Sequence, residues 1–213
     1  MTYTELQTLI QNYLENSETT FVGDLPQIIK QAEERILKSV KLPVFRKNVT
    51  GTLSAGNQFL STPSDFLDNF SLAIGTGTNL DFLYFRDVNF IREAYPDTSL
   101  QQKPQHYALY DDNSFIVAPV PNLDYAAELH YFYRPASLTA GAGSGTTWLS
   151  ENASNALLYG CLVESYVYMK GSPELQAEYE KRYFQAISRL QNLGEADNTI
   201  DTYSNGTFKR ERS

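Results

Sequence analysis

The sequence has few of the residues from which catalytic and metal sites are usually built. It contains a single cysteine, Cys161, and two histidines, His106 and His130, among 213 residues. One cysteine cannot form an internal disulfide framework, which fits a protein that folds in a reducing cytoplasm. Cys161 stands among leucines, so we expect a small buried apolar side chain rather than a nucleophile.

Motifs for catalysis and for cofactor binding are also missing. Neither histidine has a cysteine or carboxylate at a metal-ligand spacing, and both alternate with aromatic residues, so packing or surface roles are expected. The run 111–114, Asp-Asp-Asn-Ser, lacks the glycine and the final glutamate of a calcium loop and predicts a turn. The glycine-rich segments 75–77 and 141–145 lack the lysine of a phosphate-binding loop and are expected to be connectors. The sequence therefore predicts no enzyme, no cofactor and no metal.

Positive charge is scarce, and so are long apolar runs. The chain has 17 Lys and Arg against 25 Asp and Glu, a net charge of −8. This argues against a broad nucleic-acid surface, because duplex binding needs a net positive face. No apolar run approaches the ~20 residues that span a bilayer. The start, residues 1–5, has no basic segment before an apolar core, so we expect a soluble protein made without export.

Aromatic residues are abundant instead. They make up 13% of the chain, with 15 Tyr and 12 Phe. Tyrosine combines a large contact area with a polar end and is common at interfaces. Hydrophobic residues at 42% and charged residues at 20% are ordinary for one globular domain or a domain with an insertion. The composition favours binding or assembly.

Amphipathic helices are predicted at the start of the chain. Apolar residues between Leu6 and Leu14 recur at helical spacing, and Thr2-x-x-Glu5 has the spacing of a capping box. A second helix is expected to begin with Asp24 as its N-cap and Pro26 in its first turn. Its solvent-facing side is expected to include Glu33.

Longer amphipathic helices are predicted near the other end. Ser150 is expected to cap the third helix, and the segment 170–173 combines a helix stop, a new cap and a proline. The fourth helix is expected to run from Pro173 to about Leu193. Because each apolar stripe must be buried, the helices predict a bundle closed by both ends of the chain.

The region between the helices has the two-residue periodicity of β-strands. Early strands are expected at 49–53, 58–60, 69–74 and 81–85, followed by a short helix at 86–95. The first two should form a hairpin, and the loop 75–79 should join the next two. Later strands are expected near 105–110, 114–118 and 126–134, as an antiparallel meander.

The predicted fold class is therefore α+β. It is a helical bundle formed by N- and C-terminal helices, with an inserted antiparallel β domain and an extended C-terminal tail. The expected boundaries are 1–44 for the first helices, 45–147 for the insertion, 148–196 for the last helices and 197–213 for the tail.

The tail loses helical periodicity. It carries spaced apolar residues and a basic end, namely Ile200, Tyr203, Phe208, Lys209, Arg210 and Arg212. Such a segment is either a solvated terminus or a peptide that becomes ordered on a partner, since aromatic residues and arginine dominate interface energetics. Sequence alone leaves both alternatives open.

The order and spacing of several segments resemble the head-to-tail adaptor (connector) proteins of tailed bacteriophages. The segments that carry the resemblance are Ala32-Glu33-Glu34-Arg35-Ile36, Pro63-Ser64-Asp65-Phe66-Leu67, Val117-Ala118-Pro119-Val120-Pro121, Tyr131-Phe132-Tyr133-Arg134-Pro135 leading to Leu138, Trp148-Leu149, and Leu157-Leu158-Tyr159-Gly160. They span nearly the whole chain.

The resemblance implies a structural protein of the virion neck, assembled in the host cytoplasm. It implies a dodecameric ring that joins the portal to the tail and completes the DNA exit channel. The implied partners are the portal ring, neighbouring copies and the tail tube or nozzle protein, with genomic DNA passing through without sequence-specific binding. The tail residues Ile200, Tyr203, Phe208, Lys209, Arg210 and Arg212 would then bind grooves of the portal.

Other interpretations stay open. Net negative charge suits a channel through which DNA slides, or it simply maintains solubility. The β region is alternatively a binding module for a glycan or another virion protein. An enzyme is the third class, for which the sequence offers no nucleophile–base pair.

Overall fold

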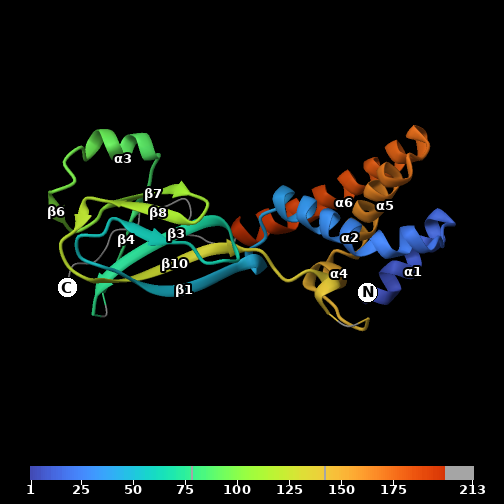
Figure 1. Cartoon of the computed structure of the whole chain (residues 1–213), viewed down its shortest axis with the longest axis horizontal. Helices are drawn as coiled ribbons and strands as arrows, with labels where there is room; N and C mark the ends of the chain where they lie inside the picture. Colours follow the sequence, from blue (N-terminus) through green and yellow to red (C-terminus); the bar gives the residue numbers. More distant parts are fainter. Residues whose placement is uncertain (78, 142, 200–213) are drawn as a thin grey trace. The chain divides into compact units, whose positions relative to one another are not determined.

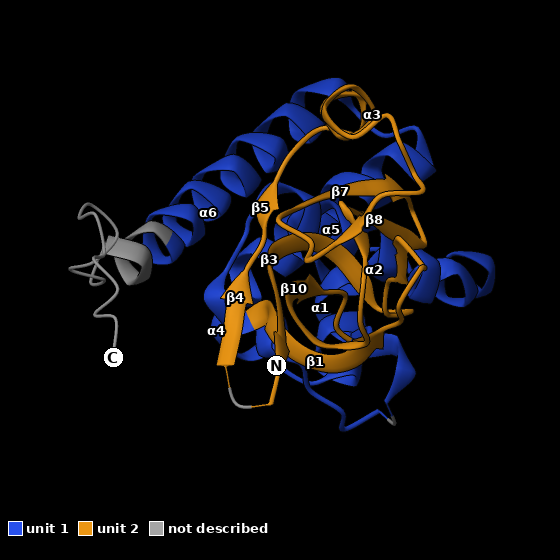
Figure 2. Cartoon of the chain, turned by 90° about the vertical axis from the view of Figure 1, so that its left-hand side faces the viewer, with its two compact units in different colours: residues 1–44, 136–213 blue, residues 45–135 orange. Residues whose placement is uncertain are grey.

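The computed structural model describes residues 1–77, 79–141 and 143–199, with the side chains of residues 195–199 left out, and the chain divides into two compact units. The helical unit comprises residues 1–44 and 136–213, and the β unit comprises Phe45–Pro135 (Figure 2). The mixture of helices and largely antiparallel sheets confirms the α+β class. The β unit ends at Pro135 rather than at 147, because Leu138 is already buried in the helical unit, where its N–H donates to the Glu33 carboxylate.

The helical unit is organised around one central helix. Its helices are α1 (Tyr3–Leu14), α2 (Thr19–Ser39), α4 (Trp148–Asn152), α5 (Ser154–Met169) and α6 (Pro173–Thr199), with 3-10 turns at Pro43–Phe45, where the chain enters the β unit, and at Leu138–Ala140. α5 packs on α1, α2, α4 and α6 (Figure 1). Its sequence is apolar on most sides, as expected of a helix surrounded by other helices.

α1 begins as predicted. The Thr2 side chain accepts a hydrogen bond from the Glu5 N–H, and the Glu5 carboxylate accepts one from the Thr2 N–H at 2.8 Å. This reciprocal pair satisfies two backbone donors that the helix leaves unpaired. Leu6 and Ile10 are fully buried against the rest of the unit.

The predicted start of α2 at Asp24 is wrong. The helix begins at Thr19 and contains Pro26 in its interior. Phe21 and Leu25 are both buried, so the apolar stripe extends one turn further upstream than the capping signal indicated. The Asp24 carboxylate instead accepts a hydrogen bond from the Tyr168 hydroxyl at 2.7 Å.

The C-terminal helices also differ in detail from the prediction. Thr147, not Ser150, is the N-cap of α4, and a break at Ala153 separates α4 from α5. The break near 170–173 is present, with Lys170 in the left-handed region at φ 53°. α6 starts at Pro173 as predicted but continues past Leu193 to Thr199.

The β unit contains two four-stranded sheets. Its elements are β1 (Arg46–Leu53), β2 (Phe59–Ser61), β3 (Phe66–Thr76), β4 (Asn79–Phe82), β5 (Tyr84–Phe85), α3 (Val88–Ala94), β6 (Gln101–Gln102), β7 (His106–Asp111), β8 (Ser114–Ala118), β9 (Val120–Pro121) and β10 (Tyr125–Tyr133). The strand orders are β1-β10-β3-β4 and β2-β8-β7-β5, and β6 pairs with β9. All neighbours are antiparallel except β5–β7 and β6–β9.

Two local pairings expected from the sequence are wrong. β1 and β2 do not form a hairpin, because β1 pairs with β10, with Val49 opposite Leu129, and β2 pairs with β8. The meander is wrong in its last strand, since β10 joins the other sheet between β1 and β3. The β7–β8 hairpin, the β3–β4 hairpin and the short helix α3 are confirmed. Alternation indicates that a segment is a strand, but it does not say which strand lies beside it.

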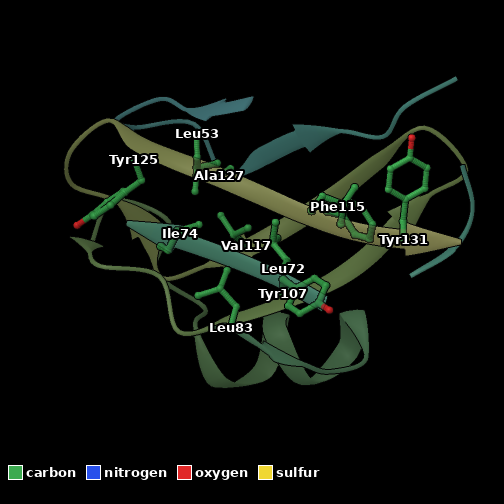
Figure 3. Close-up of a cluster of buried hydrophobic side chains, with 11 residues drawn as sticks. Leu53, Leu72, Ile74, Leu83, Tyr107, Phe115, Val117, Tyr125, Ala127 and Tyr131 are labelled. Atoms are coloured by element: carbon green, nitrogen blue, oxygen red, sulfur yellow. The ribbon is translucent and has the colours of Figure 1, made fainter. Parts of the chain in front are cut away.

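The core of the β unit draws on both sheets (Figure 3). Its buried residues are Leu53, Leu72, Ile74, Leu83, Tyr107, Phe115, Val117, Tyr125, Ala127, Leu129 and Tyr131. The buried residues of β10 in this set alternate along the strand, so its inward face is continuous. Burial raises the pKa of Tyr107 to about 12, and its hydroxyl donates to the Asn69 side chain at 2.6 Å.

The turn at 63–67 is tied into this unit by its acidic residue. The Asp65 carboxylate accepts hydrogen bonds from the Lys47 ammonium and the Tyr131 hydroxyl, each at 2.7 Å. These donors hold the pKa of the Asp65 carboxyl below its usual range, with the Lys47 bond as the largest cause. The carboxylate thereby links the turn to β1 and β10.

Candidate functional site

His106 has a structural environment. Its Nδ1 lies 2.9 Å from the Tyr95 hydroxyl, and its ring is surrounded by those of Tyr84, Phe90 and Tyr95. Burial lowers the pKa of His106, and the positive charge of Arg86 lowers it further. A neutral imidazole packed among aromatic rings accounts for this residue, as the alternation of the sequence predicted.

His130 lies in a polar cluster on the outer face of its sheet. Its Nε2 is 2.7 Å from the Asn48 side chain and 3.2 Å from the Glu128 carboxylate. A metal site needs more ligands than one imidazole and one carboxylate. Within the described ranges, no group of three or more His, Cys, Asp or Glu residues is arranged to hold a metal ion.

Cys161 and the 111–114 turn are also structural. Cys161 is fully buried, and burial raises the pKa of its thiol, so the sulfur stays protonated and inaccessible. The Asp111 carboxylate accepts hydrogen bonds from the Asn113 N–H at 2.8 Å and the Ser114 hydroxyl at 2.9 Å. Those two bonds end on the same carboxylate oxygen, Oδ1, and shape the β7–β8 turn.

The predicted portal-binding residues lie outside the described residues. They are Ile200, Tyr203, Phe208, Lys209, Arg210 and Arg212. In the part of the chain that the structure describes, several aromatic side chains are exposed on the surfaces of the two units.

The β unit carries exposed aromatic side chains along β4, β5 and α3. Phe82 is 69% exposed and Tyr84 66%, and Phe85 and Phe90 are also exposed. The Arg86 guanidinium lies over the Phe90 ring, 5.6 Å from its centroid. We call Phe82, Tyr84, Phe85 and Phe90 the aromatic row. Sequence periodicity predicted a strand at 81–85 and a short helix at 86–95 but did not indicate that these aromatic side chains face water.

Two ion pairs of Arg35 connect three helices of the helical unit. The Arg35 guanidinium of α2 donates to Glu164 of α5 at 3.1 Å and to Glu180 of α6 at 3.2 Å. It also lies over the Tyr183 ring, 4.8 Å from the centroid. Tyr183 is buried, so the next residue on α6, Phe184, faces outward and is exposed.

A surface groove lies elsewhere on the same unit, between α1, α4 and α5. Leu9 and Leu158 supply its apolar surface, and Glu5 and Glu151 stand at its rim. The amino group of Met1 donates to the Ser150 carbonyl at 3.2 Å and fixes the N-terminus beside the groove. The sequence indicated helix faces that would pack within one chain, and it did not single out this groove.

Comparison with known protein families identifies a match over most of the chain. A family model described as SU10 adaptor protein matches residues 1–207 of the chain, which include both units. No curated protein matches the chain. Among the residues that the structure describes, none of the helices is both long and apolar enough to cross a membrane.

Proposed function

The chain belongs to the SU10 adaptor protein family, a family of phage structural adaptors, and we propose that it forms a ring joining the portal to the tail. The ring is a dodecamer in the virion neck, assembled in the host cytoplasm, and it completes the DNA exit channel. The observation that carries this proposal is the family match over residues 1–207, which spans the helical unit and the β unit together.

Exposed apolar side chains on both units support an assembly role. Contiguous apolar surface on a protein marks an interaction site more often than chance exposure does. The four exposed aromatic side chains of the aromatic row, close together in the sequence of the β unit, are the candidates for such a surface, and Phe184 is a single exposed aromatic side chain of the helical unit. A protein whose copies use different surfaces to contact each other builds closed rings when the rotation closes.

The C-terminal segment is proposed to bind the portal. Its apolar residues would enter portal grooves, and its basic end would pair with acidic groove residues. The residues concerned are Ile200, Tyr203, Phe208, Lys209, Arg210 and Arg212. Such a segment gains its affinity from a few aromatic and arginine contacts.

The β unit is proposed to contact the tail tube or nozzle protein. The aromatic row supports this, because Phe82 and Tyr84 present large apolar areas that a single copy leaves in water. The same row would also suit a glycan, which is the second candidate function. Density beside these residues in the assembled neck would distinguish a protein partner from a sugar.

Genomic DNA is proposed to pass through the ring without sequence-specific binding. The net charge of −8 supports this, because a net acidic protein repels the phosphate backbone and does not hold it in place. A continuous lining of Lys and Arg that grips the duplex would contradict this part of the proposal.

The test is electron microscopy of the full chain mixed with the portal protein of the same virus. We expect a rotationally symmetric layer beneath the portal, with neighbouring copies in contact. Portal alone is the control, because it defines which density the chain adds. A single bound copy, or a layer without rotational symmetry, would contradict the proposed ring.

A further inference from the structure

We propose that neighbouring copies in the ring meet through the outer face of α6 on one copy and the α1–α4 groove on the next. The outer α6 face is defined by Lys181, Phe184 and Ser188. The α1–α4 groove is defined by Glu5, Thr8, Leu9, Glu151 and Leu158. The inference rests on the proposed ring and names the surfaces that hold it together.

The outer α6 face presents one large apolar side chain. Phe184 is 56% exposed, and its ring stands at 61° to the buried ring of Tyr183, with centroids 5.7 Å apart. Tyr183 is held under Arg35, so the backbone that carries Phe184 is anchored on α2 and α5. Phe184 is therefore an apolar side chain on an anchored helix, so a partner that covers it need not order the backbone.

The groove is a recess with an apolar floor and an acidic rim. Leu9 is 36% exposed and Leu158 is nearly buried, which gives an apolar surface that an aromatic ring can contact. Glu5 and Glu151 are exposed at the rim. Glu5 belongs to the α1 capping box, so its position is set by two hydrogen bonds to Thr2.

The net charges of the two surfaces are opposite. The residues that line the outer α6 face include two cations, Lys181 and Arg189, and one carboxylate, Glu180, which also pairs with Arg35. The residues that line the groove include two carboxylates, Glu5 and Glu151, and one cation, the N-terminal ammonium of Met1. Complementary charge at the rim of an apolar contact sets the register of the partners and speeds their encounter. Because of this complementarity, we assign the outer α6 face of a second copy as the partner that occupies the groove.

The two surfaces are separate, so the contact is head to tail. The residues that form the outer α6 face and those that form the groove do not overlap, and α5 packs between α1 and α6. In Figure 1, α6 runs along the upper side of the helical unit, whereas α4 and the start of α1 lie below α2. Each copy then offers one projection and one groove, and only a closed ring leaves neither unused.

Disulfide trapping tests the contact directly. Thr8→Cys and Ser188→Cys place thiols at exposed positions beside the groove and beside Phe184, and native Cys161 is buried and does not compete. Under mild oxidation, in the presence of portal protein, the double variant should give a ladder of covalent oligomers. Each single variant alone should stay monomeric, and a mixture of the two single variants should stop at dimers.

Charge exchange tests the complementarity. Lys181→Glu and Glu151→Lys should each weaken assembly about twofold to fivefold per contact, the range expected for exposed ion pairs. The two changes combined should restore assembly, measured as the fraction of copies in rings by mass photometry. Lys30→Glu, an exposed change of the same sign on α2, is the matched control and should leave ring formation unchanged.

The outcomes separate this inference from the proposed function. Symmetric rings on the portal without the covalent ladder of the Thr8→Cys, Ser188→Cys double variant would overturn the contact and leave the proposed ring standing. A covalent dimer of Ser188→Cys alone would show a two-fold contact between α6 faces and also overturn it. Absence of rings under every condition would overturn both.

Discussion

At the scale of single residues, the environment of Glu33 differs from the expected one. Helical periodicity assigned it to the solvent-facing side of α2, but it is 6% exposed. One carboxylate oxygen accepts the Leu138 N–H at 2.9 Å, while the other has no hydrogen-bond partner among the described residues. Burial raises the pKa of Glu33, because the ionised form loses water that these contacts replace only in part.

Ionisation of the buried Glu33 carboxyl should lower the free energy of unfolding as pH rises. The folded pKa lies above the unfolded value of about 4.3, so between the two the folded state holds more protons. The free energy of unfolding then falls as pH rises through this window, by about 1.4 kcal/mol for each unit of separation. Glu33→Gln keeps an acceptor for Leu138 and removes the titration. Its stability relative to wild type, from urea unfolding between pH 4 and pH 8, should increase with pH.

The control for this measurement is the neighbouring residue. Glu34 is exposed and paired with Lys38 at 2.8 Å, so Glu34→Gln should not reproduce the pH-dependent gain. Parallel curves of Glu33→Gln and wild type against pH would show that the carboxyl titrates alike in the folded and unfolded chains.

At the scale of elements, α2 shows a competition between a capping signal and an apolar stripe. Asp24 and Pro26 together are typical of a helix start, yet the helix begins at Thr19. Phe21, almost fully buried and 6.0 Å from the Tyr168 ring centre, belongs to the same face as Leu25. Burial of a phenylalanine is worth more than one side-chain cap, so packing determines where the helix begins.

A helix start at Thr19 and one at Asp24 predict opposite orders for the losses of stability caused by Phe21→Ala and Asp24→Ala. Phe21→Ala should lower the free energy of unfolding by about 3–5 kcal/mol, because it empties a packed site. Asp24→Ala should cost less than about 1 kcal/mol, since it removes only the exposed bond to Tyr168 from a mid-helix position. Chemical denaturation of both variants measures the contrast. A larger loss for Asp24→Ala than for Phe21→Ala would support an N-cap at Asp24.

At the scale of the whole molecule, two units are separately packed and a C-terminal segment follows them. The buried residues of α6 end at Gly194, within the described side chains. The β unit has its own core, formed by residues from both of its four-stranded sheets. The described helical and β units therefore each have buried apolar side chains of their own.

Removal of residues 200–213 should separate folding from docking. We expect the thermal midpoint to stay nearly unchanged and binding to the portal to be lost. Rising salt should weaken docking of the full chain, because the contacts of Lys209, Arg210 and Arg212 are screened within a Debye length of about 8 Å. Tyr203→Ala and Phe208→Ala should weaken docking even in high salt. Calorimetry and co-sedimentation with portal rings provide the two measurements.

The expected thermal midpoint and the expected loss of portal binding can be contradicted separately. A truncated chain that still sediments with the portal would remove the C-terminal segment from the docking interface. A truncated chain that no longer unfolds cooperatively would mean that the segment belongs to the fold.

The sequence by itself determined what depends on neighbours along the chain. The Thr2–Glu5 capping box, the break before Pro173, the β7–β8 turn and the α+β class all follow from signals within a few residues. The resemblance to phage adaptors likewise lies in the order of segments, and the family match agrees with it.

Only the tertiary structure decided which distant segments meet. β10 lies beside β1 and β3, and Glu33 is buried where Leu138, which follows the β unit in the sequence, contacts α2. The α1–α4 groove likewise needs residues from both ends of the chain. Periodicity states which face of a segment is apolar, but the partner that buries the face is chosen by packing among all segments at once. That is why the elements could be predicted while the surfaces proposed for assembly could not.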